Sequence, residues 1–114
     1  MAVEASVIAL SGYDVPNAQA TAFTVPTDVV RFRIDHAVVV NYSSSSVNLS
    51  VYILQSGDSV ADLNLRLDEL AIPAQSTVNL FDLIGEVLEN GGIINAFASS
   101  ASALALSVSG TNFT

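Results

Sequence analysis

The sequence contains no cysteine, no lysine and no tryptophan, and there is a single histidine among its 114 residues. The absence of thiols excludes disulfides, zinc–thiolate sites and cysteine nucleophiles. His36 alone supplies neither a catalytic triad nor a three-histidine metal site, and the adjacent Asp35 projects from the opposite face of a strand. We therefore expect a protein that is not an enzyme and binds no cofactor, with His36 at the end of a core face.

Positively charged residues are scarce, because only Arg31, Arg33 and Arg66 stand against eleven acidic residues, and the formal net charge is −8. Nucleic acid binding requires clustered cations that displace phosphate counterions, so we expect no nucleic acid partner. No stretch approaches the roughly 20 apolar residues of a membrane helix, and we expect no membrane association. Residues 1–10 lack a cationic start and contain Glu4, so we expect no signal peptide.

Charged residues of both signs make up only 12% of the sequence, whereas hydrophobic residues make up 51%. Typical soluble domains contain about 25% charged residues. Interface cores are depleted in charge, so this composition favours a protein whose faces are covered by neighbouring subunits. The alternative is a monomer with a polar, uncharged surface. Since one domain commonly uses about 100–150 residues, we assign residues 1–114 to a single domain.

The clearest strand signal is the alternation of apolar and polar residues between positions 30 and 42. The face predicted to be buried carries Val30, Phe32, Ile34, His36, Val38, Val40 and Tyr42. Residues 43–46 are four serines that predict a turn, and the alternation resumes over residues 47–53. A hairpin across this turn would pair Val40 with Leu49, so that core residues meet one another on one face.

A second hairpin is predicted between residues 93–98 and 103–108, across a turn at residues 99–102. One of its faces carries four small side chains that let another layer approach closely. These are Ala96, Ala98, Ala103 and Ala105. This alanine face is predicted to pack against the second sheet of the same domain, to contact a neighbouring subunit, or to do both.

The rest of the chain predicts further short strands and one helix. Between the hairpins, Leu63, Leu65 and Leu67 alternate with polar residues, as in a strand. The apolar parity then switches to Leu70, which indicates a bulge or a bend. Apolar residues at helical spacing over residues 80–88, followed by two glycines, predict a helix of about two turns. Weaker strands are predicted at residues 3–10 and 18–25. Seven or eight short strands with one short helix predict an all-β fold, an antiparallel β-sandwich or jelly roll.

Three sets of residues are candidates for binding. Arg31 and Arg33 share an outward face with Asp35 and are our first choice for a contact with an acidic partner surface. Possible oxygen ligands for calcium cluster in sequence, although their spacing matches no EF-hand loop and solvated acids are the simpler interpretation. They are Asp58, Asp62, Asp68 and Glu69. The outward aromatic residues that a carbohydrate-binding module would need are Tyr13, Tyr52 and Phe113.

Residues 72–110 contain Ile-Pro-Ala-Gln-Ser-Thr-Val-Asn-Leu, Val-Leu-Glu-Asn-Gly-Gly-Ile-Ile-Asn-Ala-Phe-Ala and Leu-Ala-Leu-Ser-Val-Ser-Gly. Together with the preceding Ser-Val-Asn-Leu-Ser-Val-Tyr-Ile-Leu, this segment resembles small structural proteins of tailed bacteriophage virions. The resemblance covers roughly residues 30–110. It carries no functional residue over to this chain.

The resemblance implies a protein made in the host cytoplasm and located in the virion, most directly on the capsid surface. There it would be a decoration or cement protein that binds the major capsid protein and forms a homo-oligomer, often a trimer. A neck, tail or fibre-attachment component has the same composition and fold. A carbohydrate- or calcium-binding β-sandwich module is the alternative outside the virion.

Overall fold

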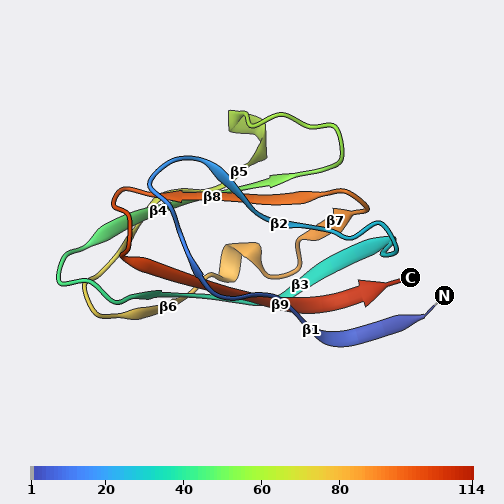
Figure 1. The fold of residues 1–114 in the computed structure, drawn as a ribbon, viewed down its shortest axis with the longest axis horizontal. Coiled ribbons are helices and arrows are strands. Elements are labelled where there is room, and N and C mark those ends of the chain that lie inside the picture. Colours follow the sequence, from blue (N-terminus) through green and yellow to red (C-terminus); the bar gives the residue numbers. More distant parts are fainter. Residues whose placement is uncertain (1) are drawn as a thin grey trace.

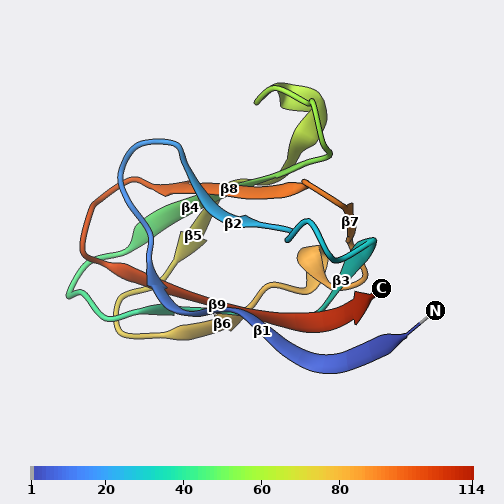
Figure 2. The same cartoon turned by 45° about the vertical axis from the view of Figure 1, so that its right-hand side comes forward.

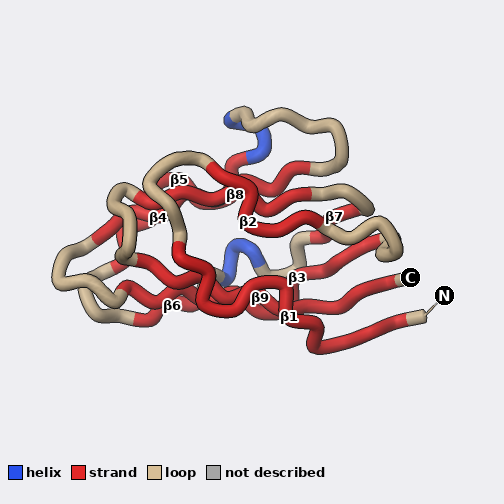
Figure 3. The backbone as a smooth tube through the Cα atoms, in the orientation of Figure 1, coloured by secondary structure: helices blue, strands red, loops and turns tan. Residues whose placement is uncertain are grey.

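The structure is a computed structural model that describes residues 2–114, in which nine β-strands form two antiparallel sheets packed face to face (Figures 1 and 3). The strands are β1 (Val3–Asp14), β2 (Ala20–Thr24), β3 (Arg31–Asn41), β4 (Val47–Leu54), β5 (Leu65–Ile72), β6 (Thr77–Asn79), β7 (Val87–Glu89), β8 (Ile93–Ala98) and β9 (Leu104–Phe113). Two short 3₁₀ helices are η1 (Asp62–Asn64) and η2 (Phe81–Leu83). Within this described part, no helix is long and apolar enough to cross a membrane.

The strand order is that of a jelly roll, one of the two architectures that the sequence predicts. Sheet A has the order β1-β9-β3-β6, with β7 also paired to β3, and sheet B has the order β2-β8-β4-β5. The first strand pairs with the last, β2 pairs with β8, and β4 pairs with β5. The chain is therefore one long antiparallel hairpin rolled into two layers, and its tip is the β4–β5 connection (Figure 2).

The two predicted serine-turn hairpins are wrong, because each serine turn joins strands of different sheets. Strand β3 pairs with β9, which places Val40 opposite Ala105, and β4 pairs with β8, which places Leu49 opposite Ala98. The serine segments are corners at which the chain passes from one sheet to the other. The apolar strand faces consequently meet across the core and not side by side within one sheet.

Asn41 organises the first of these corners. Its side chain is completely buried, and Nδ2 donates hydrogen bonds to the carbonyl oxygens of Ser45 and Ile72 at 2.8 and 2.9 Å. Its Oδ1 atom accepts hydrogen bonds from the backbone N–H and the hydroxyl of Ser43 at 2.9 and 2.7 Å. One side chain thus satisfies the polar backbone of the corner and ties the end of β3 to the end of β5.

Strand β3 contains a bulge that reverses its buried face. Ile34 pairs with Gly110 and His36 pairs with Ser109, so Asp35 is the extra residue. Before the bulge, Phe32 and Ile34 of the predicted face are buried, although Val30 is exposed. Beyond the bulge the buried residues are Ala37, Val39 and Asn41. The prediction that His36 ends a core face is therefore wrong, because one inserted residue moves every later side chain to the other face.

The parity switch predicted in β5 is confirmed as a bulge. Leu67 pairs with Val51 and Leu70 pairs with Leu49, so two residues of β5 lie opposite one residue of β4. Glu69, one of the two, adopts a φ of 49°. This left-handed backbone conformation lets the strand change the face that it buries.

The helix predicted over residues 80–88 is wrong in its extent. Only Phe81–Leu83 forms a 3₁₀ turn, and Val87–Glu89 is strand β7. Gly85 adopts a φ of 91°, and its N–H donates to the carbonyl oxygen of Ile34 at 2.8 Å. Pairing with the exposed edge of β3 therefore overrides the helical spacing, which is a weak preference beside tertiary contacts.

One apolar core fills the space between the two sheets, with η2 lying between them (Figure 1). Its largest fully buried side chains include Phe32, Ile34, Leu49, Ile53, Ile72, Leu80, Leu83, Leu88, Ile94, Leu104 and Leu106. They come from both layers and from η2. Burial of these side chains on folding holds sheet A and sheet B in fixed relation, so that each sheet presents a rigid outer face.

Candidate interaction surface

The outer face of sheet A is formed by β1, β9, β3, β6 and β7. Its middle strand, β9, carries the small outward side chains Ala105, Ser107, Ser109 and Thr111. The flanking strands carry larger side chains, among them Ile8, Arg31, Arg33, Val38 and Val40. Because the middle strand is lined by small residues, the face is hollowed along β9.

The predicted alanine face does not lie on this surface as a unit. Ala96, Ala98 and Ala103 belong to the apolar core, with 0%, 1% and 2% of their surface exposed. Only Ala105 is half-buried on the outer face of sheet A. The interpretation in which the alanines pack within the domain therefore applies to these three, and a role for them in an intersubunit contact is wrong because no surface remains.

The predicted arginine patch is present on the outer face of sheet A, and Arg33 is held there by a polar network. Its Nε donates to Asp35 Oδ1 at 2.8 Å, and Nη2 donates to Thr111 Oγ1 at 3.3 Å. The Thr111 hydroxyl donates to Asp35 Oδ2 at 2.6 Å. The guanidinium carbon also lies 5.7 Å from the centroid of the Phe113 ring, within the range of a cation–π contact.

This network stabilises the ionised form of Asp35. The hydrogen bond from Arg33 is the main cause that lowers the pKa of the Asp35 carboxyl group, followed by the hydrogen bond from Thr111. Asp35 thus neutralises Arg33 and does not orient His36.

Arg31 lies in the same patch, but no hydrogen bond or ion pair joins its guanidinium group to any of residues 2–114. It lines a shallow hollow of about 290 Å³ together with Arg33, Val87 and Phe113. The residue opposite Arg31 on β7 is Glu89. An exposed guanidinium above an apolar floor is suited to a carboxylate on a partner surface.

A second hollow of about 310 Å³ lies further along β9, and we call it the β9 hollow. It is lined by Ile8, Leu10, Ser11, His36, Val38, Ser107, Val108 and Ser109. Its walls are apolar side chains of β1 and β3, and its floor is formed by serines. His36 contributes an exposed imidazole to one wall.

Tyr42 marks the other end of this face. Its hydroxyl donates to Asp14 Oδ1 at 3.0 Å, which connects the end of β3 to the end of β1. Desolvation raises the pKa of Tyr42, and the adjacent Asp14 carboxylate raises it further. The phenol therefore stays neutral over the ordinary pH range.

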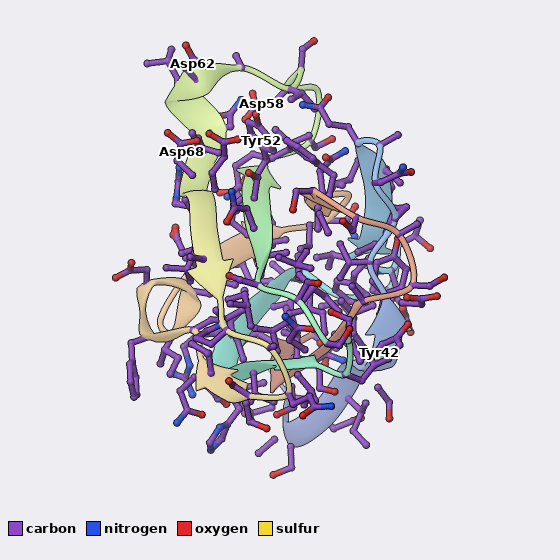
Figure 4. The ribbon with its side chains drawn as sticks, turned by 90° about the vertical axis from the view of Figure 1, so that its left-hand side faces the viewer. Tyr42, Tyr52, Asp58, Asp62 and Asp68 are labelled. Carbon is purple, nitrogen blue, oxygen red and sulfur yellow. The ribbon has the colours of Figure 1, made fainter. Side chains whose placement is uncertain are left out.

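The acidic residues considered as calcium ligands lie around the connection between β4 and β5, residues 55–64, which we call the β4–β5 loop. Asp58 Oδ2 accepts a hydrogen bond from the Gln55 N–H at 3.0 Å, so this carboxylate closes a turn. Figure 4 shows Asp62 at the outer end of the loop and Asp68 on the strand that follows. Among the residues that the structure describes, no group of three His, Cys, Asp or Glu side chains is placed to hold a metal ion.

The β4–β5 loop presents an apolar side chain at its tip. Leu63, in η1, has 91% of its surface exposed. The loop is ordered by internal hydrogen bonds, including Asn64 Nδ2 to the Ser59 carbonyl oxygen at 2.7 Å. At its base Arg66 Nε donates to both carboxylate oxygens of Glu86, at 2.8 and 3.2 Å.

The aromatic residues considered for carbohydrate binding are divided between the two sheets. Tyr52 is on sheet B, where its ring lies 6.4 Å from that of Phe97, nearly parallel to it. Tyr13 and Phe113 belong to β1 and β9 of sheet A. The three predicted aromatics do not form one platform.

Sheet B also buries Asn95, whose Oδ1 has no hydrogen-bond partner within the described chain.

Two features of this surface were missed by the sequence reasoning. Leu63 was interpreted as part of a strand, because it alternates with Leu65 and Leu67, and the turn-forming residues Gly57 and Asp58 were the available signal for a loop. The β9 hollow joins β1, β3 and β9, which are far apart in sequence, and only the strand order brings them together.

No protein-family model matches this sequence, and no curated protein matches it in sequence. Solved structures of infectious bursal disease virus are similar to it in fold. A chain of the T13 viral particle has a TM-score of 0.57 at 12% identity, over 98% of this chain and 31% of that chain. The structure of the Gx strain has a TM-score of 0.56 at 14% identity, over 96% of this chain and 31% of that chain. The VP2 subviral particle has a TM-score of 0.51 at 12% identity, over 97% of this chain and 32% of that chain.

These identities show a shared fold and nothing finer. The chain spans about a third of the length of each of these viral chains.

Proposed function

We propose that this protein is a non-enzymatic structural component of a virus particle, and that residues 1–114 act as one jelly-roll domain within it. The observation that carries the proposal is the jelly-roll likeness, which spans 98% of this chain, to a chain of a viral particle. Jelly rolls also occur in lectins and in enzymes, so fold alone does not decide between these classes. The surface supplies the second argument.

Large apolar side chains are exposed on several sides of the chain. They include Val3, Ile8, Val30, Val40, Leu63, Phe81 and Val87. With only 12% charged residues, the surface around them has few charges. Such a surface is costly in water and is favourable when neighbouring subunits cover it, as they do in an assembled particle.

In its specific form, the proposal is a capsid decoration or cement protein that binds the major capsid protein. The arginine patch of Arg31 and Arg33 is the proposed contact for acidic groups of that partner, because no carboxylate of residues 2–114 forms an ion pair with Arg31. Binding only to assembled shells would stabilise them by mass action.

The test is to add the purified protein to empty particles that lack it and to sediment the mixture. We expect saturable binding at a fixed ratio to the major capsid protein, and a higher temperature of particle disassembly. Arg31→Glu should weaken binding about tenfold or more, since it reverses a charge at the proposed contact. Arg66→Glu is not a matched control, because Arg66 pairs with Glu86. Ser44→Glu is suitable, because it adds negative charge at an exposed position outside the patch.

Location within the particle distinguishes the decoration protein from a neck, tail or fibre-attachment component. Gold labelling of a tagged chain in electron micrographs should mark the shell. Label confined to the neck or tail would replace the decoration role with that alternative, and absence of label from purified particles would contradict the virion proposal as a whole.

A further inference from the structure

Two aromatic side chains lie together on the outer face of sheet B. Tyr52 of β4 and Phe97 of β8 point away from the core, because the residues on either side of each are buried in it. The centroids of their rings are 6.4 Å apart, and the rings are 20° from parallel. Both side chains are half-buried, so part of each remains open to solvent. The pair therefore gives a ligand an apolar surface on which to pack.

Asn95 lies on the same face, opposite Tyr52 in the pairing of β8 with β4. Its surface is 7% exposed, and its Oδ1 has no hydrogen-bond partner among residues 2–114. An amide oxygen that is buried without a donor destabilises the folded chain, and an apolar side chain of similar size would avoid that cost. A residue that is unfavourable in the free chain is explained if a ligand supplies the missing donor.

A hydroxyl group meets this requirement. It is small, and it can donate to Oδ1 of Asn95 while it accepts a hydrogen bond from another group. The oxygen is covered in the free chain, so a donor reaches it only after a neighbouring side chain rotates. Such changes of rotamer are common on binding. The two rings and the amide together suit a ligand with an apolar face and hydroxyl groups at its rim, which is the chemistry of a sugar ring.

The charges around this face favour a neutral sugar. None of the residues of β2, β8 and β4 is charged. Beside them, the β4–β5 loop carries two acidic residues and β5 carries two more, namely Asp58, Asp62, Asp68 and Glu69. The arginine of this region, Arg66, is paired with Glu86. An anionic ligand would be repelled here, whereas carboxylates accept hydrogen bonds from neutral hydroxyl groups.

The β4–β5 loop limits what can approach this face. It stands over sheet B (Figures 1 and 2), and Figure 4 shows Tyr52 below it. Hydrogen bonds within the loop, at Asp58 and Asn64, hold it in place. A broad, flat protein surface would meet the loop before it met the sheet, whereas a single sugar ring is narrow enough to lie beside it. The shape therefore favours a sugar over a second copy of the chain.

We propose that the outer face of sheet B binds a neutral sugar unit of a glycan. The sugar ring packs on Tyr52 and Phe97, and one of its hydroxyl groups donates to Oδ1 of Asn95. This inference goes beyond the proposed function, because it concerns a different ligand and a different face from the arginine patch. It is tested on the isolated chain, so its failure leaves the virion role standing and failure of the virion role leaves it intact.

The test titrates the purified chain with the methyl glycosides of glucose, galactose, mannose and N-acetylglucosamine, which are neutral, and with that of sialic acid, which is anionic. Nuclear magnetic resonance signals of the Tyr52 and Phe97 rings and of the Asn95 amide report binding at this face. We expect at least one neutral sugar to shift these signals to saturation, with a dissociation constant of about 1 mM, as suits so small a ligand. The sialic acid glycoside should not shift them.

Substitutions of the rings locate the site. Tyr52→Ala and Phe97→Ala should each raise the dissociation constant about tenfold or more, because each removes part of the surface on which the sugar packs. Tyr13→Ala is the matched control and should leave it within about twofold, because Tyr13 is a half-buried strand residue of sheet A. Phe97→Tyr keeps the ring and should keep binding. Circular dichroism and thermal melting establish that each variant is folded.

Asn95→Leu separates binding from structure. If Asn95 serves the ligand, this variant should weaken sugar binding about tenfold, while its melting temperature stays the same or rises because the unpaired amide is gone. An amide that served the fold would give the opposite pair of results. A lower melting temperature with unchanged sugar binding would therefore overturn the role given to Asn95.

Several outcomes would overturn the proposal as a whole. One is the absence of any shift with the neutral sugars at about 50 mM, a concentration at which even a weak site would be largely filled. Binding of the sialic acid glycoside alone would reject a neutral ligand. Sugar binding that survives Tyr52→Ala but not Tyr13→Ala would move the site to sheet A. Self-association of the chain that is lost in Phe97→Ala would assign the outer face of sheet B to a second copy.

Discussion

Single polar side chains determine how this chain passes between its sheets, and Asn41 is the clearest of them. It is fully buried and makes four hydrogen bonds to the first serine corner and to the end of β5. The sequence did not predict this role, because a polar residue at the end of a strand is ordinarily assigned to the solvent. Its partners, Ser43, Ser45 and Ile72, are defined only by the folded corner.

Asn41→Ala should lower the free energy of unfolding by about 1–3 kcal/mol, because it removes the buried amide that donates to the carbonyl oxygens of Ser45 and Ile72. Urea denaturation of the variant measures the change. Ser44→Ala, an exposed substitution in the same corner, should change stability by less than about 0.5 kcal/mol. Equal effects of the two substitutions would contradict the role given to Asn41.

Gly110 is required where β9 crosses the bulge of β3. A Cβ atom at this position would overlap the carbonyl oxygen of Arg33 and lie 2.7 Å from Cζ of Phe32. Gly110→Ala should therefore destabilise the protein by about 1–3 kcal/mol or more, since the backbone must shift. Thermal unfolding tests this, with Gly57→Ala as the comparison. A Cβ at Gly57 meets no atom within 4 Å, so the cost there comes only from its φ of 87° and is about 1–2 kcal/mol. A smaller loss at Gly110 than at Gly57 would contradict the packing described.

Asp35 should make stability depend on pH. Its pKa is lowered in the folded state, so its stabilising contribution is complete above the unfolded carboxyl pKa of about 3.9 and is lost as the pH falls through the lower folded value. The difference in unfolding free energy between the unaltered protein and Asp35→Asn should be constant from pH 7 to about 5 and shrink below about 4. Denaturation at several pH values measures it. A difference that grows on acidification would show that the Arg33 contact does not stabilise the ionised carboxylate.

At the scale of the elements, the strands were predictable and their partners were not. Alternation located most of the strands, and the parity switch located the bulge in β5, because both depend on neighbouring residues. The two serine corners resemble hairpin turns in sequence, and a jelly roll pairs strands from distant parts of the chain. Residues 80–88 have helical spacing, but Val87–Glu89 pair with the edge of β3 as strand β7. Both errors arise where contacts between distant residues outweigh local preference.

The bulge in β5 gives a prediction at this scale. Glu69 has a φ of 49°, a conformation that costs a residue with a Cβ about 1–2 kcal/mol and costs glycine little. Glu69→Gly should preserve or raise the melting temperature, whereas Glu69→Val should lower it, because β-branched residues tolerate this region least. Differential scanning calorimetry of the pair tests the prediction. A higher melting temperature for the valine variant would show that this backbone conformation is not required.

At the scale of the whole molecule, the candidate surface combines features that were visible in the sequence with others that were not. The arginine patch was predicted from Arg31 and Arg33 on one strand face, and the structure places both side chains on the outer face of sheet A. The sequence left the alanine face open between packing within the domain and an intersubunit contact, because small residues suit both kinds of close packing. The β9 hollow and the Leu63 tip depend on strand order and loop shape, which composition does not encode.

The most direct test of the virion role is quantitative mass spectrometry of purified intact particles from the source of this sequence. We predict that the chain is present at a copy number that is a simple ratio to the major capsid protein, and that it stays with the particles through a density gradient. Detection of the chain in the producing cells together with its absence from the purified particles would contradict the account.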